Sequence, residues 1–275
     1  MTEEINKKYL KEKQYKSTKY LEARIKIHQF TTNKIGFHEW IFSQYDLSEI
    51  SKIKEEIKIL DVGCGTGVFW KKNIKNFEKY KLDITFTDSS EAMIEKEKGN
   101  TAELNAKKNF EIADIDNLDK YKNNFDIVFC HNVIYHAGDK DNSIKNLKDC
   151  LNDKPSSFCS ITTNSEKHML NVYEIGRKLD KNFPTDRIID SFTEEIADQM
   201  LPKHFKLEKK IEEEELRVTD WEILMGFVAS GVEPRGIKLV ENFWDSYKKI
   251  YDQEIQKNGY FKIIKRSPLY ICRKM

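Results

Sequence analysis

One short segment constrains the fold more than any other part of this chain. Residues 57–67 read Ile-Lys-Ile-Leu-Asp-Val-Gly-Cys-Gly-Thr-Gly, an apolar run that ends on Asp61 and continues into three alternate glycines. The apolar run predicts a buried strand, and glycine lets a ligand lie against the main chain. An acid at the strand end can hold a ligand ammonium or brace the amides of the turn. The combination favours a zwitterionic, adenosine-containing ligand over a bare phosphate.

Two other glycine-rich loops do not fit this spacing. A dinucleotide-binding turn has the pattern G-x-G-x-x-G, but its last position falls on Val68 when counted from Gly63 and on Trp70 when counted from Gly65. A phosphate-binding loop needs G-x-x-x-x-G-K-[ST], and no Gly-Lys pair follows this segment. An ordinary strand-to-helix turn with spare glycines stays an alternative.

Strand and helix patterns alternate along the middle of the chain. Strands are predicted near 57–62, 82–87, 108–113, 125–130 and 156–163, and helices near 67–79, 90–98 and 140–151. Strand followed by helix, repeated, indicates parallel pairing with crossovers and hence a doubly wound α/β sheet. Ligands of such sheets bind outside the carboxyl ends of the strands.

Strand and helix patterns do not alternate in this way in the segments before and after the middle of the chain. Helices are predicted over the first fifty-odd residues, 166–181, 193–202 and 219–256, and strands over 205–217 and 260–273. Pro268 suggests a bulge or bend in the last strand. The acidic run 212–215 is interpreted as a solvated strand end.

Acidic residues follow the second and third predicted strands. Asp88, followed by Ser89, ends the second strand at a distance from Asp61 that suits an acid binding ribose hydroxyls. A helix N-cap is the alternative for Asp88. Asp114 ends the third strand, where it can accept the adenine amino hydrogen while Ile115 lies on the ring; a surface turn is the alternative.

The fourth strand runs into a loop that contains His131, Tyr135 and His136. These side chains are candidate proton acceptors or groups that position a substrate. The alternatives are that His131 packs beneath a ligand and offers only its backbone, and that His136 satisfies a hydrogen bond in the core. Met93 is a further candidate neighbour of an adenine ring, although a methionine on that helix is also a common core residue.

Composition narrows the class of protein. The chain has 275 residues, with 47 Lys and Arg against 46 Asp and Glu, a net charge of +1. We therefore expect no nucleic-acid partner, because such proteins usually carry a basic surplus. Five cysteines without a CxxC pair predict neither disulfides nor a metal site. The charged N-terminus and the lack of long apolar runs predict a cytoplasmic protein without membrane insertion.

Together these segments resemble the class I S-adenosylmethionine (SAM)-dependent methyltransferases. The resemblance rests on ILDVGCGTG, TFTDSS, ADIDNL and FDIVFCHNVIYHAGD, and is specific over about residues 57–163. Outside that range, two further segments resemble the small-molecule branch (methyltransferase types 11 and 25) that includes quinone-biosynthesis C-methyltransferase relatives. They are SFTEEIADQMLPKHFKLEK and LRVTDWEILMGFVASG. The resemblance implies a Rossmann-like seven-stranded, mostly parallel sheet with its last strand antiparallel.

The resemblance also implies an organisation and a cofactor. The whole chain is expected to be one methyltransferase domain, with a helical lid in 1–55, a SAM-binding core in 56–163 and the rest of the sheet with lid insertions in 164–275. SAM would be converted to S-adenosylhomocysteine (SAH) by direct displacement, which need not involve a general base. The expected acceptor is a small molecule, and the protein a monomer or homodimer. Arg24 and Tyr15 are candidates to reach the SAM carboxylate or close the lid.

Site residues follow from the same resemblance. The three glycines would line the methionine end of SAM, Asp61 would brace its ammonium and His131 would offer backbone. The predicted catalytic residues are His136 and Tyr135; no metal ligand is predicted. The predicted cofactor-binding residues are Asp61, Gly63, Cys64, Gly65, Thr66, Gly67, Asp88, Ser89, Met93, Asp114, Ile115, His131, Arg24 and Tyr15.

Two departures and two alternatives complete the prediction. The fourth motif lacks the Asp/Asn-Pro-Pro-aromatic run of amino-group nucleic-acid methylases, and Cys130 follows Phe129 rather than the proline of five-position cytosine methylases. Both kinds of nucleobase chemistry are therefore disfavoured. An RNA or protein methyltransferase stays an alternative that a basic face at Lys7, Lys8, Lys11 and Lys13 would favour. A catalytically silent SAM-binding module is the other alternative.

Overall fold

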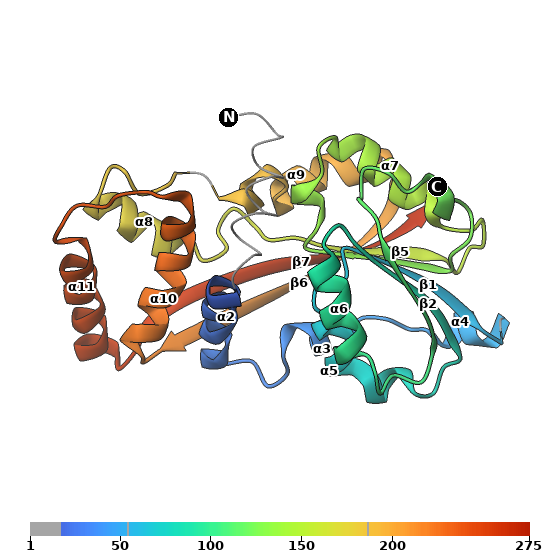
Figure 1. The fold of residues 1–275 in the computed structure, drawn as a ribbon, viewed down its shortest axis with the longest axis horizontal. Coiled ribbons are helices and arrows are strands. Elements are labelled where there is room, and N and C mark those ends of the chain that lie inside the picture. Colours follow the sequence, from blue (N-terminus) through green and yellow to red (C-terminus); the bar gives the residue numbers. More distant parts are fainter. Residues whose placement is uncertain (1–17, 54, 186) are drawn as a thin grey trace. The chain divides into compact units, whose positions relative to one another are not determined.

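The computed structural model describes residues 18–53, 55–185 and 187–275 (Figure 1). Two compact units make up the fold. The sheet unit comprises Ile35–Ser165, Ser191–Glu212 and Ser267–Met275, and the helical unit comprises the segment that ends at Lys34, Glu166–Asp190 and Glu213–Arg266. Each unit is described by itself below.

A seven-stranded sheet is the main element of the described chain. Its strands are β1 (Ile57–Val62), β2 (Leu82–Asp88), β3 (Lys107–Ile112), β4 (Ile127–His131), β5 (Phe158–Thr162), β6 (Phe205–Val218) and β7 (Phe261–Lys274). Their order is β3-β2-β1-β4-β5-β7-β6. Neighbours among the first five strands pair in parallel, whereas β7 runs antiparallel to β5. The predicted fold class is confirmed, including the antiparallel last strand.

Helices connect and cover the strands of the sheet unit. The α-helices are α3 (Phe37–Ser43), α4 (Ser48–Ile53), α5 (Val68–Phe77), α6 (Glu91–Asn100), α7 (Lys140–Cys150) and α9 (Glu194–Met200). Short 3-10 turns are η3 (Asp119–Tyr121), η4 (Ile134–His136), η5 (Ile188–Ser191, shared with the helical unit) and η6 (Leu201–Lys203). Strand, helix, strand and helix follow one another from β1 to β3, as the alternating pattern predicts.

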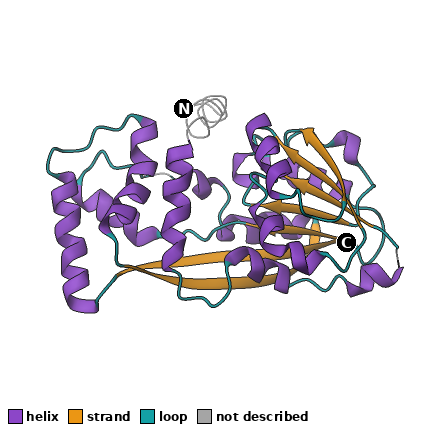
Figure 2. Cartoon of the chain, turned by 60° about the horizontal axis from the view of Figure 1, so that its bottom comes forward, coloured by secondary structure: helices purple, strands orange, loops and turns teal. Residues whose placement is uncertain are grey.

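Two apolar layers flank the sheet, with helices outside the strands (Figure 2). Successive residues of a strand face opposite sides, so Leu60 packs in one layer with Ile144 of α7, whereas Ile59 packs in the other with Trp70 of α5. Burial on both faces explains why β1 reads as an almost continuous apolar run. Part of the predicted N-terminal lid belongs to this core, because Ile41 of α3 is completely buried in the second layer.

The helical unit has a core of its own. Its elements are α2 (Thr18–Lys26), η2 (Ile27–Phe30), α8 (Leu170–Leu179), α10 (Trp221–Val232), η7 (Glu233–Arg235) and α11 (Phe243–Asn258), together with the parts of β6 and β7 that lie in Glu213–Arg266. Phe243 and Tyr247 of α11 are completely buried among Leu216 of β6 and Ile263 of β7. The helical segments predicted from the sequence thus enclose a packed core.

The interpretation of residues 212–215 as a solvated strand end is wrong for half of the run. Strand alternation turns Glu212 and Glu214 to one face, where they are only 6% and 7% exposed. Glu214 forms a buried ion pair with Lys265 of β7. A partner on another strand, far away in the sequence, therefore compensates for the burial. As for Pro268, β7 continues through this residue as one strand.

Candidate functional site

The glycine-rich loop lies where β1 ends, at the carboxyl edge of the sheet. Gly63, Gly65 and Gly67 have φ values of 68°, 60° and 75°, a left-handed backbone that favours glycine at all three positions. The N–H of Cys64 donates to the carbonyl of Thr87 in β2 at 2.9 Å, which ties the loop to the neighbouring strand. The motif therefore forms a tight turn that leads into α5.

The space around the three glycines differs from one position to the next. A Cβ atom on Gly63 would come within 2.5 Å of Val133, and one on Gly67 within 2.1 Å of Glu97, so both glycines permit close packing inside the protein. A Cβ atom on Gly65 would meet no protein atom within 4 Å. The main chain at Gly65 is thus open to a ligand, as the predicted cofactor requires.

Asp61 lies beside this loop and is only 5% exposed. Its Oδ2 accepts a hydrogen bond from Nε1 of Trp70 at 2.6 Å, and its carbonyl accepts one from Thr87 at 3.0 Å. Burial raises the pKa of Asp61 to about 7, against the effect of the Trp70 hydrogen bond and with a further rise from the charge of Asp88. Asp61 is therefore held in place by a neighbour and poised to gain or lose a proton near neutral pH.

Asp88 ends β2 and braces the loop directly. Its Oδ2 accepts from the N–H of Gly65 at 3.0 Å, and its Oδ1 accepts from the N–H of Ser90 at 2.8 Å, just before α6. Burial raises the pKa of Asp88, although these backbone donors favour the ionised form. The N-cap of α6 is Ser90, so Asp88 is not the helix N-cap that was its alternative role; it braces the loop and the turn before α6. Each carboxylate oxygen has a second acceptor position, so ribose binding stays a prediction.

The other predicted cofactor-binding residues lie in the glycine loop, just before α6 and on α6. The carbonyl of Thr66 accepts from the side chain of Asn100 in α6 at 2.7 Å. Burial raises the pKa of the Cys64 thiol. Ser89 is exposed, whereas Met93 is 7% exposed on the inner face of α6.

Asp114 follows β3 and closes a turn. Its Oδ1 accepts from the N–H of Asp116 at 3.0 Å, as the surface-turn alternative requires. Ile115 is 6% exposed and belongs to the core layer that contains Val62. The structure brings Asp114 and Asp88 to neighbouring strand ends, because Asp88 pairs with Ile112 in the β2–β3 ladder. Their roles toward adenine and ribose stay predictions.

His131 ends β4, and its side chain takes part in a partly buried hydrogen-bond network. Its Nε2 lies 2.9 Å from Oγ of Ser160 and 3.2 Å from the hydroxyl of Tyr45, which is itself 2.6 Å from Ser160. The ring packs against Phe69 and Phe129. Burial lowers the pKa of His131 to about 3. The side chain is thus a neutral core group, which agrees with the alternative that His131 serves a ligand only through its backbone.

Tyr135 and His136 lie together in η4, beyond the end of β4. Their rings make an edge-to-face contact with centroids 4.5 Å apart. The carbonyl of Tyr135 accepts from the hydroxyl of Ser191 at 2.9 Å, and the N–H of His136 donates to Val133 at 2.8 Å. The pair therefore has a defined position, and its catalytic role stays a prediction.

Of the two predicted lid residues, Arg24 lies within the described part of the chain. Arg24 belongs to the helical unit, where its guanidinium donates to the hydroxyl and carbonyl of Ser230 at 3.2 and 3.1 Å. Tyr15 lies outside the described residues. The predicted contacts of Arg24 and Tyr15 with SAM stay predictions.

The sequence analysis missed the acid beneath the loop. Glu97 of α6 is completely buried, and neither of its carboxyl oxygens has a hydrogen-bond partner among the described residues. Burial raises the pKa of Glu97 to about 9, and the charges of Asp61 and Asp88 add to the rise. A signal was present, because Glu97 follows Met93 by one helical turn and shares its buried face.

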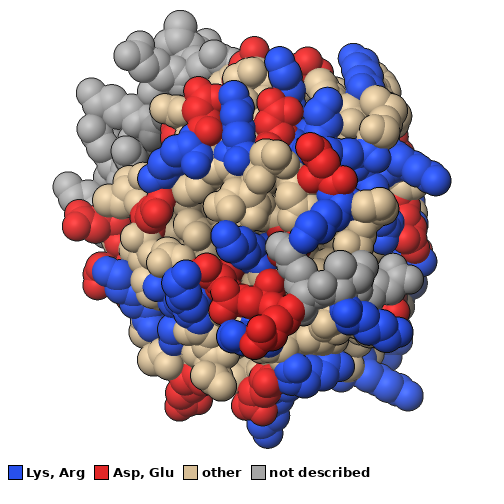
Figure 3. Space-filling view, turned by 90° about the vertical axis from the view of Figure 1, so that its right-hand side faces the viewer, with Lys and Arg blue, Asp and Glu red and all other residues tan. Residues whose placement is uncertain are grey.

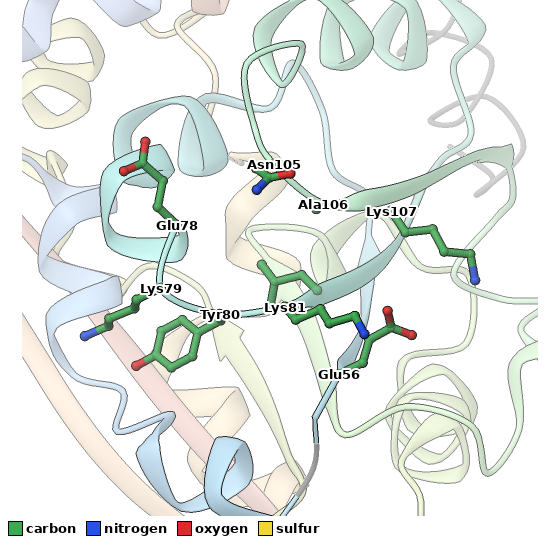
Figure 4. A pocket seen from close by; sticks show the side chains of 9 residues that line it. Glu56, Glu78, Lys79, Tyr80, Lys81, Asn105, Ala106 and Lys107 are labelled. Atoms are coloured by element: carbon green, nitrogen blue, oxygen red, sulfur yellow. The ribbon is translucent and has the colours of Figure 1, made fainter.

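A cavity of about 440 Å³ lies elsewhere, at the amino ends of β2 and β3 (Figure 4). Its lining residues are Glu56, Glu78, Lys79, Tyr80, Lys81, Leu82, Asn105, Ala106 and Lys107. None of the predicted site residues lines it. In the part of the chain that the structure describes, no cluster of His, Cys, Asp and Glu could hold a metal ion, and no helix is long and apolar enough to cross a membrane.

Comparisons with known proteins find methyltransferase relatives of this chain. The ubiquinone biosynthesis O-methyltransferase of Coxiella burnetii is 28% identical over 117 residues, which cover 42% of this chain and 47% of that protein. The tRNA U34 carboxymethyltransferase of Campylobacter jejuni is 25% identical over 197 residues, which cover 70% of this chain and 66% of that protein. Overall, the matches to curated relatives span from about a quarter to two thirds of the relatives' length.

A structural and a family comparison identify the fold and the family. BH2331 of Bacillus halodurans C-125, a candidate methyltransferase, has a similar structure with a TM-score of 0.54 at 14% identity, over 83% of this chain and 98% of BH2331. A family model described as "Methyltransferase domain" matches residues 53–229, which is well over half of the chain. The resemblance inferred from the sequence motifs is confirmed: this chain belongs to the methyltransferase domain family.

Proposed function

We propose that this protein transfers a methyl group from SAM to a small-molecule acceptor and releases SAH. Membership of the methyltransferase domain family supports the reaction type. The similarity to a ubiquinone biosynthesis O-methyltransferase supports a small-molecule acceptor, over the 42% of this chain that the match covers.

The observation that carries the proposal is the open backbone at Gly65, which is hydrogen-bonded to Asp88 and follows the end of β1 that carries Asp61. A Cβ atom there would meet no protein atom within 4 Å, although the flanking glycines are closely packed. Asp88 fixes the N–H of Gly65 at 3.0 Å, and Asp61 lies at the end of the adjoining strand. A main chain with open space beside it and acidic side chains at the adjoining strand ends suits a ligand that carries hydroxyl groups and a positive charge.

The main task of the protein in this reaction is to position the cofactor. Bound SAM supplies an electrophilic methyl group on a positively charged sulfur. Asp61 and Asp88 would hold the cofactor ammonium and ribose, and the backbone of the glycine loop would fix the methionine end. Alignment of this kind can lower a barrier by up to about 7–11 kcal/mol in well-oriented model systems.

A general base is needed only if the acceptor keeps a proton that it does not shed unaided. The side chain of His131 is unsuited to that role, because it is buried and hydrogen-bonded to Ser160, and burial lowers its pKa to about 3. His136 and Tyr135 remain our candidates, since both follow the end of β4 in η4. The expectation that helical segments enclose the acceptor is part of the same proposal.

RNA is a second candidate acceptor, because the tRNA-modifying relative matches 70% of this chain. Against it, basic and acidic side chains are interleaved on the face shown in Figure 3, and the net charge is +1. The lysines proposed for a basic face, Lys7, Lys8, Lys11 and Lys13, lie outside the described residues. Binding of a tRNA that weakens steeply with salt would favour this candidate.

Calorimetric titration tests the cofactor. We expect SAM and SAH to bind to the purified protein and NAD to give no heat. Asp88→Asn removes the charge but keeps a similar shape, and should weaken SAM binding about tenfold or more, as loss of a charge-assisted hydrogen bond does. Asp83→Asn is the matched control, because Asp83 lies at the other end of β2 and pairs with Lys107. Unchanged SAM affinity in Asp88→Asn would contradict the proposed site.

Turnover tests the acceptor class. The protein is incubated with methyl-labelled SAM and either a panel of phenols, quinols and carboxylic acids or total tRNA, and the label is followed by mass spectrometry. We expect transfer to a member of the small-molecule panel. Transfer only to tRNA would replace that acceptor class, and tight SAM binding without transfer to any acceptor would indicate a catalytically silent module.

A further inference from the structure

The proposed function leaves the buried carboxyl of Glu97 unexplained. Its oxygens lie beneath Gly67, so close that a Cβ atom on this glycine would come within 2.1 Å of Oε2. The side chain is 0% exposed, and neither oxygen has a hydrogen-bond partner among the described residues. Burial of an ionised carboxylate without a partner is costly, so such a group keeps its proton instead.

The groups that face Glu97 from the neighbouring elements are mostly acidic. Asp61 at the end of β1, Asp88 at the end of β2 and the thiol of Cys64 in the loop all interact with it electrostatically. Three carboxyl groups around one loop cannot all ionise freely, so their protons are shared and their titrations are coupled.

Nearby lysines do not neutralise this group of acids. On α5, which packs against α6, Lys71 donates to the side-chain oxygen of Asn100 at 2.9 Å. Lys98 on α6 itself pairs with Glu95 at 2.6 Å. The other lysines of these helices and of β3 are Lys72, Lys75 and Lys96, which are exposed, Lys107, which pairs with Asp83, and Lys108, which donates to carbonyls at Thr101, Ala102 and Leu104. In the described chain, a positive charge at this loop is left for a ligand to supply.

We propose that Glu97 holds a proton in the ligand-free protein and releases it to solvent when a cationic nucleoside binds at the glycine loop. This inference rests on the proposed function, since SAM is the cation in question. In the step, the O–H bond of the Glu97 carboxyl breaks, the proton passes to water or buffer, and the carboxylate that remains is stabilised by the ligand charge. No other bond changes and no oxidant or reductant is involved.

The coupling makes the site sensitive to the charge on the ligand sulfur. SAM carries a positive sulfur, whereas the sulfur of SAH is neutral, so SAM should displace more of a proton than SAH does. SAM should also bind more tightly as the pH rises from about 7 to about 9, by at most about tenfold per pH unit for one proton. After methyl transfer the ligand sulfur is neutral, so the proton returns to Glu97. The charge coupling then no longer favours binding of the product SAH.

Calorimetry in buffers of different ionisation enthalpy measures the proton directly. SAM is titrated into the protein at pH 8 in phosphate, HEPES and Tris, and the slope of the observed enthalpy against the buffer enthalpy gives the number of protons released. We expect a clear release with SAM, a smaller one with SAH, and loss of most of the SAM-linked release in Glu97→Gln. Glu95→Gln is the matched control, because Glu95 lies on the same helix but is exposed, and it should release as much as the wild type.

The outcomes separate this inference from the proposed function. SAM binding with equal proton release in the wild type and Glu97→Gln overturns the role of Glu97 and leaves the proposed function intact. Absence of SAM binding to the wild type overturns both. If Glu97→Gln does not fold, Glu97→Ala replaces it, because a methyl group is small enough to lie beneath Gly67, and the same loss of proton release is expected.

Discussion

The indole of Trp70 donates a hydrogen bond of 2.6 Å to Oδ2 of Asp61, nine residues earlier and at the other end of the glycine turn. The bond joins the first turn of α5 to the end of β1 across the loop, so the conformation of the loop is fixed from both sides. It also favours the ionised form of Asp61, the form that a ligand ammonium needs.

Trp70→Phe keeps an aromatic ring and removes this donor. We expect a loss of about 1–3 kcal/mol in the free energy of unfolding, because the carboxyl of Asp61 remains buried without its partner. The pKa of Asp61 should rise further above about 7, so SAM should bind more weakly than to the wild type at pH 7 and recover toward pH 9. Denaturation monitored by circular dichroism measures the loss of stability, and SAM titrations at pH 7 and pH 9 measure the change in affinity. Trp40→Phe, on α3, is the control. A deficit of the same size at pH 7 and pH 9 would contradict the role assigned to this bond.

The glycines of the loop should respond differently to alanine. Gly65→Ala should cost about 1–2 kcal/mol of stability, since φ is +60° and no protein atom is near, but the added methyl should lower SAM affinity about tenfold or more. Gly236→Ala is a matched control, because Gly236 has a φ of +66° and similarly open surroundings in the helical unit. The control should lose similar stability and keep its SAM affinity. Equal effects on SAM affinity would mean that Gly65 does not face the ligand.

Gly67→Ala tests the packing against Glu97. The methyl would overlap the carboxyl of Glu97, so the loss of stability should exceed the roughly 1–2 kcal/mol that left-handed backbone strain alone costs. Glu97→Ala removes the overlapping atoms, and the Gly67→Ala change should cost less in that background. A double-mutant cycle by urea denaturation measures the coupling. Additive effects would show that the two residues do not meet.

Much of the fold could be predicted from the sequence because its determinants are local. The β1 run, the Asp61 end and the glycine turn are contiguous, and so are the helix patterns between the strands. The number of strands and the antiparallel β7 came from the resemblance to a known family, which the sheet confirms, whereas the order of the strands was not predicted.

The features that were not predicted from the sequence are contacts between residues far apart in the chain. His131 bonds with Tyr45, 86 residues earlier, and Glu214 pairs with Lys265, 51 residues later. No local pattern contains these partners. Glu97 is different, because its place on the buried face of α6 was visible from Met93, but its position beneath Gly67 depends on how α6 packs against the loop.

Glu97 should also make the stability of the ligand-free protein depend on pH. Its pKa is raised to about 9 in the folded protein, against an ordinary value of 4.5. Between these values the unfolded chain has lost a proton that the folded protein retains, so the free energy of unfolding falls as the pH rises. The contribution is fully present below about pH 4.5 and is lost by about pH 9. Asp61, whose pKa is raised to about 7, adds to the fall at lower pH.

Urea denaturation at pH 5.5, 7 and 8.5 measures this dependence. Glu97→Gln should reduce the fall between pH 5.5 and 8.5 by at most about 4 kcal/mol, because one proton contributes no more than about 1.4 kcal/mol per pH unit. Glu95→Gln should leave the fall unchanged. Parallel profiles for the wild type and Glu97→Gln would mean that Glu97 ionises normally in the folded protein.

His131 should remain neutral over the whole physiological range. Burial lowers its pKa to about 3, against an ordinary value of 6.5, so the unfolded chain binds a proton that the folded protein does not. Stability should therefore be present above about pH 6.5 and decrease as the pH falls toward 3. In NMR spectra of the imidazole groups, the signal missing in His131→Gln identifies this residue and should not shift between pH 5.5 and 8. Tyr45→Phe, which removes the hydroxyl that contacts both His131 and Ser160, should cost about 1 kcal/mol of stability per hydrogen bond and leave His131 neutral. A titration midpoint near 6.5 would show that the ring is accessible to protons, and would return His131 to the candidates for a catalytic base.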